Sequence, residues 1–282
     1  MRDESGPVKH IIALQRSATP PGWTIRRNGR ILGTVSARRY NPISLPNIDF
    51  DSCTPDLRKK LLHESPLFRE LDSTAIEEIN THFADHGYAA GETIIQEGAP
   101  AERFFIVALG IVKLFRYTES GDSVLLDVLG QGDHFGSPAG FGPERYSETA
   151  IALSTVCALN MDADEFRSIL EQHSQVAVRT VEALSTRLGL AHEMVTQLGH
   201  APAKQRIAYV LYRLSRKFGT QWEGKFLIGA PLGREEIASM AGTTTETCSR
   251  VLSDLQNAGL ITAGRGWVAL SSPNALEELL PE

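Results

Sequence analysis

The chain has 282 residues, enough for roughly two domains. Apolar residues make up 42% and charged residues 22%, an ordinary globular composition, and no apolar run reaches the roughly 18 residues of a membrane span. Three scattered cysteines, Cys53, Cys157 and Cys248, form no disulfide framework, and the N-terminus lacks the apolar core of a secretory signal. We therefore expect a cytoplasmic protein with no membrane partner.

The net charge of −6 is unevenly distributed. Residues 1–50 hold eight Lys/Arg and three Asp/Glu, hence +5, and residues 200–282 hold nine and eight, hence +1, which leaves −12 for residues 51–199. An acidic molecule gains no general attraction to DNA. Any contact with nucleic acid must therefore use a small local surface.

Residues 1–55 are basic and rich in Pro, Gly, Asn and Arg, and no hydrophobic period persists. We expect an irregular N-terminal extension. One alternative is a basic arm that contacts the DNA backbone. Another is that part of the segment is not translated, which would require a non-ATG start because no Met occurs between Met1 and Met161.

Residues 56–173 change character. A short helix with Ser73 as its cap is followed by apolar or alternating runs of four to eleven residues: ETII, RFFIV, IVKLFRY, SVLLDVL and TAIALSTVCAL. Glycines separate these runs. Many short strands with regularly spaced turns predict a small antiparallel β-roll or barrel.

Residues 174–200 predict a long helix with a hinge at its end. Its apolar residues repeat at intervals of three and four over three heptads: Val181, Leu184, Leu188, Ala191, Val195 and Leu198. A stripe this narrow is typical of a two-stranded coiled coil, although a helix packed on its own domain remains the alternative. The pattern indicates a homodimer.

Residues 201–282 predict an amphipathic helix, a short strand, two helices and a final strand–turn–strand with Gly264-Arg265-Gly266 at the turn. Gly242 separates the two short helices and Thr244 caps the second. On that second helix Cys248 belongs to the apolar stripe, and the opposite side carries four polar residues: Glu246, Ser249, Arg250 and Ser253.

These three residue types suit base edges in DNA. Arginine bonds bidentately to guanine, a carboxylate accepts from cytosine, and serine serves a base or a phosphate. A surface ion pair between Glu246 and Arg250 is the competing interpretation. Around the helix, four residues are candidate contacts to the DNA backbone: Arg234, Thr244, Thr245 and Arg265.

With a β-roll, a long helix and a C-terminal unit of helices and a strand–turn–strand in this order, the chain resembles the CRP/FNR family of bacterial transcription regulators over about residues 60–270. The stretches that carry the resemblance are AGETIIQEGAPAERFFIVALGIVKLF, the QGDHFG turn, the dimer helix and ETCSRVL. ETCSRVL is similar to the FNR-type recognition helix, Glu-x-x-Ser-Arg, with Ser249 as the distinguishing residue. The resemblance implies an α+β fold, a TTGAT half-site in an inverted repeat such as TTGAT-N4-ATCAA, and RNA polymerase as a partner.

The resemblance also suggests effectors, whose binding motifs can be compared with this sequence. Cyclic-nucleotide binders in the family carry Gly-Glu-Leu and Arg-Ser-Ala in one loop, whereas this loop has Ser137-Pro138 and Arg145-Tyr146, and Ala191-His192 replaces two hydroxyl residues on the dimer helix. We therefore do not expect cyclic AMP. An iron–sulfur cluster on four cysteines is excluded because the chain has three.

Haem remains a candidate cofactor for sensing NO or CO. The available ligands are Cys157 and a few histidines, His134, His192 and the pair His82 and His86, which a helix would place one turn apart. A second candidate signal is oxidation of Cys248, although its place on the apolar stripe favours simple packing. An unidentified small ligand, or regulation by abundance alone, completes the alternatives.

We therefore expect a homodimeric DNA-binding regulator, activator or repressor according to site position, and not an enzyme. A cupin-type enzyme would need a His-x-His…Glu…His set, but residues 87–165 contain one histidine, His134. A scaffold that uses the roll and coiled coil without DNA is the third class. A signal in the roll would act through the hinge at residues 199–202. The sequence leaves the effector, the target genes and the role of residues 1–55 open.

Overall fold

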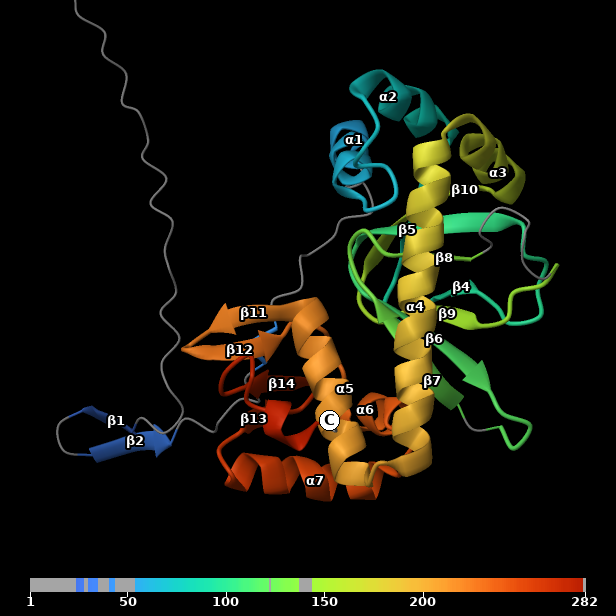
Figure 1. Ribbon diagram of the computed structural model, residues 1–282. Helices are drawn as coiled ribbons and strands as arrows, with labels where there is room; N and C mark the ends of the chain where they lie inside the picture. The colour runs from blue at the N-terminus through green and yellow to red at the C-terminus, as the bar shows by residue number, and fades with distance from the viewer. Residues whose placement is uncertain are drawn as a thin grey trace, which may run out of the picture. The chain divides into compact units, whose positions relative to one another are not determined.

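The computed structural model of the chain describes residues 24–27, 30–34, 41–43, 54–121, 123–136 and 144–280 (Figure 1). The chain divides into two compact units, residues 1–40 and 41–282. In the first unit, β1 (Thr24–Arg27) and β2 (Arg30–Thr34) form an antiparallel hairpin. The expectation of an irregular extension is therefore wrong for these strands. Cys53 and most of residues 1–55 lie outside the described residues.

The second unit begins with helices α1 (Pro55–Glu64) and α2 (Ser73–His82), followed by a β-roll. The roll consists of two four-stranded antiparallel sheets, ordered β3-β10-β5-β8 and β4-β9-β6-β7. Its strands are β3 (Ala84–Tyr88), β4 (Thr93–Ile95), β5 (Arg103–Leu109), β6 (Val112–Tyr117), β7 (Ser123–Leu129), β8 (His134–Gly136), β9 (Thr149–Ala152) and β10 (Val156–Asp162).

Strand β5 explains how the roll is built from its sequence. Five consecutive residues of RFFIVAL are buried, because both faces of the strand are covered. Phe104 and Ile106 face the helices, where the Phe104 ring stacks on Phe166 with 3.8 Å between ring centroids. Phe105 and Val107 face the interior between the two sheets.

Three local predictions in the roll are wrong in detail. Asp72, not Ser73, caps α2, since its side chain accepts from Ala75 N at 2.9 Å. The run TAIALSTVCAL is not one strand: β9 and β10 belong to different sheets. His82 ends α2 and His86 lies on β3, so the two histidines do not share a helix face.

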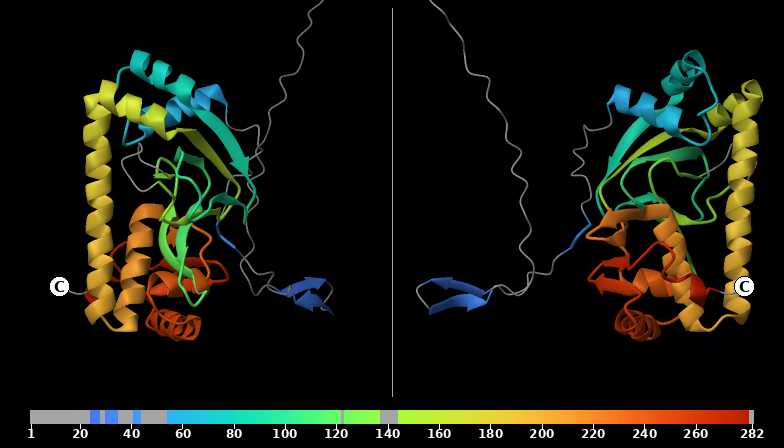
Figure 2. Two further views of the ribbon diagram at one scale, coloured as in Figure 1. Left: turned by 90° about the vertical axis from the view of Figure 1, so that its right-hand side faces the viewer. Right: turned by 60° about the vertical axis from the view of Figure 1, so that its left-hand side comes forward.

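Helix α3 (Ala163–Gln172) closes the roll and leads into α4 (Ser174–His200), the 27-residue helix of the unit. Both views of Figure 2 show α4 standing alongside the roll and the C-terminal helices. Among the described residues, no helix is both long and apolar enough to cross a bilayer.

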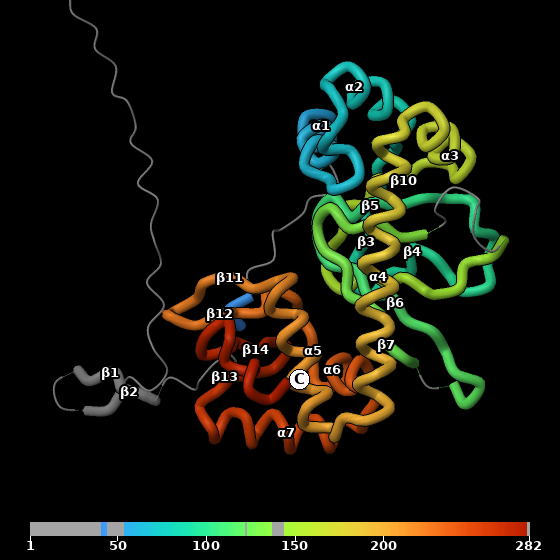
Figure 3. Tube along the Cα trace, in the orientation of Figure 1, coloured from blue at the N-terminus to red at the C-terminus, as the bar shows by residue number. Residues whose placement is uncertain are grey.

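The C-terminal part is a winged helix–turn–helix (Figure 3). Helices α5 (Ala203–Phe218), α6 (Arg234–Met240) and α7 (Thr245–Asn257) pack beside a four-stranded sheet ordered β11-β12-β14-β13. Its strands are β11 (Gly219–Trp222), β12 (Lys225–Ile228), β13 (Ile261–Gly264) and β14 (Trp267–Leu270), and the short helix η2 (Glu277–Leu279) follows. The wing predicted around Arg265 is therefore present, and β11 is an unpredicted addition.

Candidate DNA-reading surface

Helices α6 and α7 are joined by a turn that depends on Gly242. This glycine has φ +57°, a left-handed conformation that residues with a Cβ rarely adopt. A Cβ on Gly242 would also lie 2.4 Å from Leu198 Cδ2 on α4. Thr244 then caps α7 as predicted, because its hydroxyl accepts from Thr247 N at 3.2 Å. The sequence thus determines both the start of α7 and its approach to α4.

Helix α7 has one buried and one outward face. The buried face contains Cys248, Val251, Leu252 and Leu255, as the spacing predicts. On the outward face, the side chains of Glu246 and Arg250 are 84% and 71% exposed. Ser249 is half-buried, at the border of this face.

Glu246 and Arg250 form an ion pair on the surface of α7. Glu246 Oε1 lies 4.0 Å from Arg250 Nη2, at the limit of an ion pair. Exposed i, i+4 pairs typically contribute less than about 0.5 kcal/mol. Breaking this ion pair so that both side chains can contact base edges therefore costs little free energy.

The four residues predicted to contact the DNA backbone are all exposed: Arg234, Thr244, Thr245 and Arg265. At the start of α6, the Gly233 N–H already donates to Glu236 Oε2 at 3.0 Å. That N–H is therefore not available to a phosphate, whereas Arg234, the first residue of α6, is exposed. The Thr244 hydroxyl is likewise engaged in capping and also donates to the Thr247 hydroxyl.

Helix α4 carries two stripes. One stripe faces the chain's own roll and C-terminal helices through Val176, Ala183 and Met194. The other is the predicted seam, and every member is exposed or half-buried: Val181 63%, Leu184 39%, Leu188 56%, Val195 67% and Leu198 45%, together with Ala191. The described part of the chain thus leaves much of this apolar stripe exposed along most of the length of α4.

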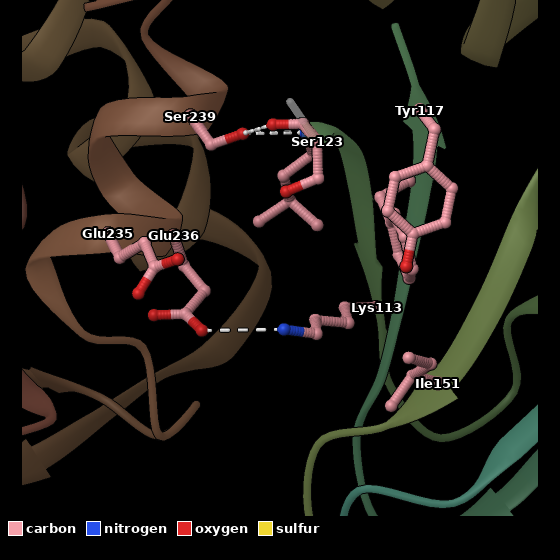
Figure 4. Close-up of a pocket in the computed structure, with 9 residues that line it drawn as sticks. Lys113, Tyr117, Ser123, Ile151, Glu235, Glu236 and Ser239 are labelled. Carbon is pink, nitrogen blue, oxygen red and sulfur yellow. Dashed lines mark hydrogen bonds and ion pairs between the residues drawn. The ribbon is translucent and has the colours of Figure 1, made fainter. Parts of the chain in front are cut away.

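The roll and α6 meet at a polar junction that sequence reasoning missed. Ser239 Oγ accepts from Leu125 N at 2.8 Å and donates to Ser123 O at 2.9 Å, so α6 completes the edge of β7. Lys113 Nζ lies 3.5 Å from Glu236 Oε1, across a cavity of about 180 Å³ (Figure 4). No sequence pattern marks these residues, because each bond joins segments more than 100 residues apart.

His134 lies on β8 instead of in a turn, which corrects the prediction for this residue. Its Nε2 atom is buried and, within the described part of the chain, accepts or donates no hydrogen bond. Burial, aided by the charge of Arg187, lowers the pKa of His134 to about 4. The Arg187 guanidinium of α4 donates to the His134 carbonyl at 2.9 Å.

The other effector candidates do not come together. His82 pairs with Glu165 at 3.5 Å, His192 is exposed on α4, and His86 lies on β3. Cys157 is buried and disulfide-bonded, which corrects the expectation of three separate thiols. Among the described residues, no group of three His, Cys, Asp or Glu side chains is placed to hold a metal ion.

Two further candidates bear on cyclic nucleotides and on oxidation. Ser137 and Pro138 lie outside the described residues, whereas Arg145 Nη1 donates to the chain's own Gly98 O at 2.6 Å. Cys248 is fully buried, and burial raises the pKa of its thiol to about 11. This surrounding suits a packing role for Cys248 better than a reactive thiolate.

Comparison with known proteins assigns both halves of the second unit. Residues 86–173 match the family described as Cyclic nucleotide-binding domain, and residues 205–279 match the one described as Crp-like helix-turn-helix domain. A Mycobacterium tuberculosis protein named "CRP-like cAMP-activated global transcriptional regulator" is 28% identical over 217 residues, 77% of this chain and 94% of its own length. A "Global nitrogen regulator" of Synechocystis is 27% identical over 190 residues, 66% of this chain and 84% of its own.

Among solved structures, a CRP/FNR-family transcriptional regulator of Thermus thermophilus is 28% identical. Its TM-score is 0.57, and the match covers 70% of this chain and 97% of that one. The two domains occur here in the same order, joined by one long helix. The chain therefore belongs to the CRP/FNR family of DNA-binding transcription regulators.

Proposed function

We propose that this chain is a homodimeric regulator that reads a TTGAT-type inverted repeat through Glu246, Ser249 and Arg250. The observation that carries the proposal is the outward face of α7, where two opposite charges stand more than two-thirds exposed in a loose pair. Arginine and glutamate suit the two sides of the G·C pair in TTGAT. The family resemblance supplies the half-site itself.

Dimerisation is supported by the uncovered seam of α4. Two copies of this helix would bury the stripe in a coiled coil and place two α7 helices about a two-fold axis. Such an axis suits an inverted repeat with half-sites about one DNA turn apart.

Leu188→Asp, which places a charge in the seam, should therefore yield monomers in analytical ultracentrifugation. Ser185→Asp, on an exposed position of α4 beside the seam, should remain dimeric; a monomeric wild-type protein would contradict the proposal.

The base-reading assignment is tested with matched DNA duplexes. Replacing the G·C pair of each TTGAT half-site by A·T should weaken wild-type binding by about 10- to 100-fold. Arg250→Ala should bind both duplexes equally weakly. Arg265→Ala, which removes a phosphate contact, should weaken both by the same factor and keep the preference for G·C. Equal binding of consensus and scrambled duplexes by the wild type would contradict base reading and favour the scaffold alternative.

We propose that a signal is sensed in the roll, or that the amount of the protein in the cell alone sets its activity. The names of two relatives at nearly the same identity differ: one is called cAMP-activated, and the other is called a global nitrogen regulator. Identity therefore does not select the effector. The polar junction of Ser239 with β7 offers the route by which a change in the roll would reach α6.

Haem is the alternative signal carrier, and His134 is the ligand that fits it best. Its Nε2 is buried and without a partner in the described part of the chain, and its low pKa keeps the ring neutral at pH 7. An absorption spectrum after haem reconstitution tests this alternative. A stoichiometric Soret band that His134→Ala removes would support haem, whereas a flat spectrum would exclude it.

The proposal also includes RNA polymerase as a partner and the cytoplasm as the location of the protein. Both follow from the family resemblance, because such regulators act where the chromosome is transcribed. Transcription in vitro with purified polymerase, on promoters with the TTGAT repeat at different distances from the start, would separate activation from repression.

A further inference from the structure

Arg206 lies in the first turn of α5, directly after the hinge between α4 and the DNA-binding part. Its guanidinium donates to three backbone carbonyls: Nη1 to Ala201 O at 3.0 Å, Nε to Ala241 O at 2.8 Å, and Nη2 to Gly242 O at 3.0 Å. Ala201 ends α4, whereas Ala241 and Gly242 form the turn that leads into α7. One side chain thus joins the end of the dimer helix to the start of the recognition helix.

The chemistry of this contact is specific to arginine. A guanidinium is planar and presents its N–H donors in a fixed fork, so three acceptors held by it are fixed relative to one another. A lysine ammonium at the same place would keep the charge but not the fork. The carbonyls belong to two helix ends, and each lacks a partner within its helix at that position.

A second contact reinforces the same geometry. Leu198, in the last turn of α4, lies so close to Gly242 that a Cβ there would come within 2.4 Å of it. The turn before α7 is therefore held from two sides, by the Arg206 fork and by the α4 surface. The direction of α7 relative to the axis of α4 follows from these contacts.

We propose that Arg206 is the positioning residue that sets the spacing between the two half-sites which the dimer accepts. This inference rests on the proposed function. One base pair added between half-sites rotates one of them by roughly 35° about the duplex axis, since about 10 to 10.5 base pairs complete a turn. A rigid connection from α4 to α7 rejects such a rotation, whereas a loosened one tolerates it.

The experiment measures the affinity of the full-length protein for inverted repeats with spacers of three, four, five and six base pairs. The wild type should prefer one spacer by about tenfold or more over its neighbours, the cost of one misplaced half-site contact. Arg206→Lys should reduce this preference to about twofold while a single half-site is bound as in the wild type. Arg213→Lys, the same exchange two turns later on α5, should keep the wild-type profile.

The spacer profile separates positioning from simple stabilisation. If Arg206 only stabilises the fold, Arg206→Lys lowers the affinity for every spacer by one factor, and the proposal is wrong. An unchanged profile also overturns it. Should Arg206→Lys fail to give a soluble dimer, Arg206→Gln takes its place, with the same two outcomes. A wild type that binds no inverted repeat contradicts the proposed function, and one that binds all spacers alike contradicts only the role of Arg206.

Discussion

Lys217 Nζ of α5 lies 2.8 Å from Asp133 Oδ2 in the turn before β8. Asp133 also accepts from Gly130 N at 2.8 Å, and the Phe218 ring packs so closely on Gly130 that a Cβ there would come within 2.6 Å. The end of α5 is thus held on the roll by charge and by shape at adjacent residues. Together with the junction at Ser239, this contact holds the DNA-binding part against the roll.

Lys217→Met should lower the free energy of unfolding by about 0.5–1 kcal/mol, because both partners are one-third exposed and water screens the pair. The loss should shrink in high salt. Urea unfolding at two salt concentrations measures it. Lys204→Met, an exchange at an exposed position of the same helix, should have little effect; equal losses for the two variants would contradict the assignment.

Gly242→Ala should destabilise the protein more than Gly259→Ala. Both glycines have positive φ, +57° and +72°, so alanine costs about 1–2 kcal/mol of backbone strain at either. Only Gly242 of the two has a close neighbour, Leu198, whereas nothing lies within 4 Å of a Cβ on Gly259. Since Leu198 belongs to the proposed seam, Gly242→Ala should also weaken dimerisation, measured by sedimentation at several concentrations. Equal effects would show that Leu198 moves aside freely.

Cys248 should behave as a packing residue. With a pKa of about 11 and no exposure, its thiol should react with iodoacetamide at pH 8 at least roughly 100-fold more slowly in the native protein than in urea. Mass spectrometry of the peptide that contains Cys248 measures the rates. Cys248→Ser should cost about 1–3 kcal/mol, because a buried hydroxyl replaces a nearly apolar group. Rapid labelling of Cys248 in the native protein would contradict the packing role and support regulation by oxidation of this thiol.

His134 should make the protein less stable in acid. Its pKa is about 4 in the folded chain, against 6.5 when unfolded, so below pH 6.5 the unfolded state binds the proton first. Stability is therefore full above pH 6.5 and falls until about pH 4, by roughly 2 kcal/mol at pH 4.5. Arg187 and Lys217 add to the lowering of the pKa, and Asp133 opposes it.

The test compares urea unfolding of the wild type and His134→Phe at pH 7 and pH 4.5. Phenylalanine keeps an aromatic ring beside Phe104, whose centroid lies 5.8 Å from that of His134. The variant should lose about 2 kcal/mol less than the wild type between the two pH values. An identical pH dependence of both proteins would show that the His134 ring is protonated freely in the folded state.

Features that depend on local periodicity could be predicted from the sequence. The two faces of α7 follow from apolar residues at three- and four-residue spacing after a Thr244 cap, and the structure confirms them. The α4 helix is confirmed in the same way. The wing around Arg265 follows from two β-prone runs with glycines between them.

Other elements could not be predicted because their signals are weak or ambiguous. β3 is polar and largely exposed, so no alternation marks it, and the prediction that His86 shares a helix with His82 is wrong for that reason. β9 and β10 are both apolar, and a continuous run does not show where a chain changes sheets. The hairpin of β1 and β2 has a recognisable signal in its Asn-Gly dipeptide, which the Pro- and Arg-rich surroundings obscure.

The residues that connect the roll, α4 and the DNA-binding part could not be predicted for a different reason. Arg206, Lys217 and Ser239 are ordinary polar residues on amphipathic helices, and their partners lie on elements far away along the chain. A single sequence does not show such pairings. Helix patterns therefore predicted the outward face of α7, which we propose reads DNA, but not the contacts that hold α7 in place.

One apolar cluster contains Phe115, Leu125 and Val128 of the roll together with Ile207, Leu211 and Leu252 of the DNA-binding part. The two functional halves therefore share an interior and are not separable modules. Heating should melt the second unit in one calorimetric transition. Grafting residues 201–282 onto a foreign sensor would expose half of a core, so the two sequences must change together for this regulator to acquire a new signal.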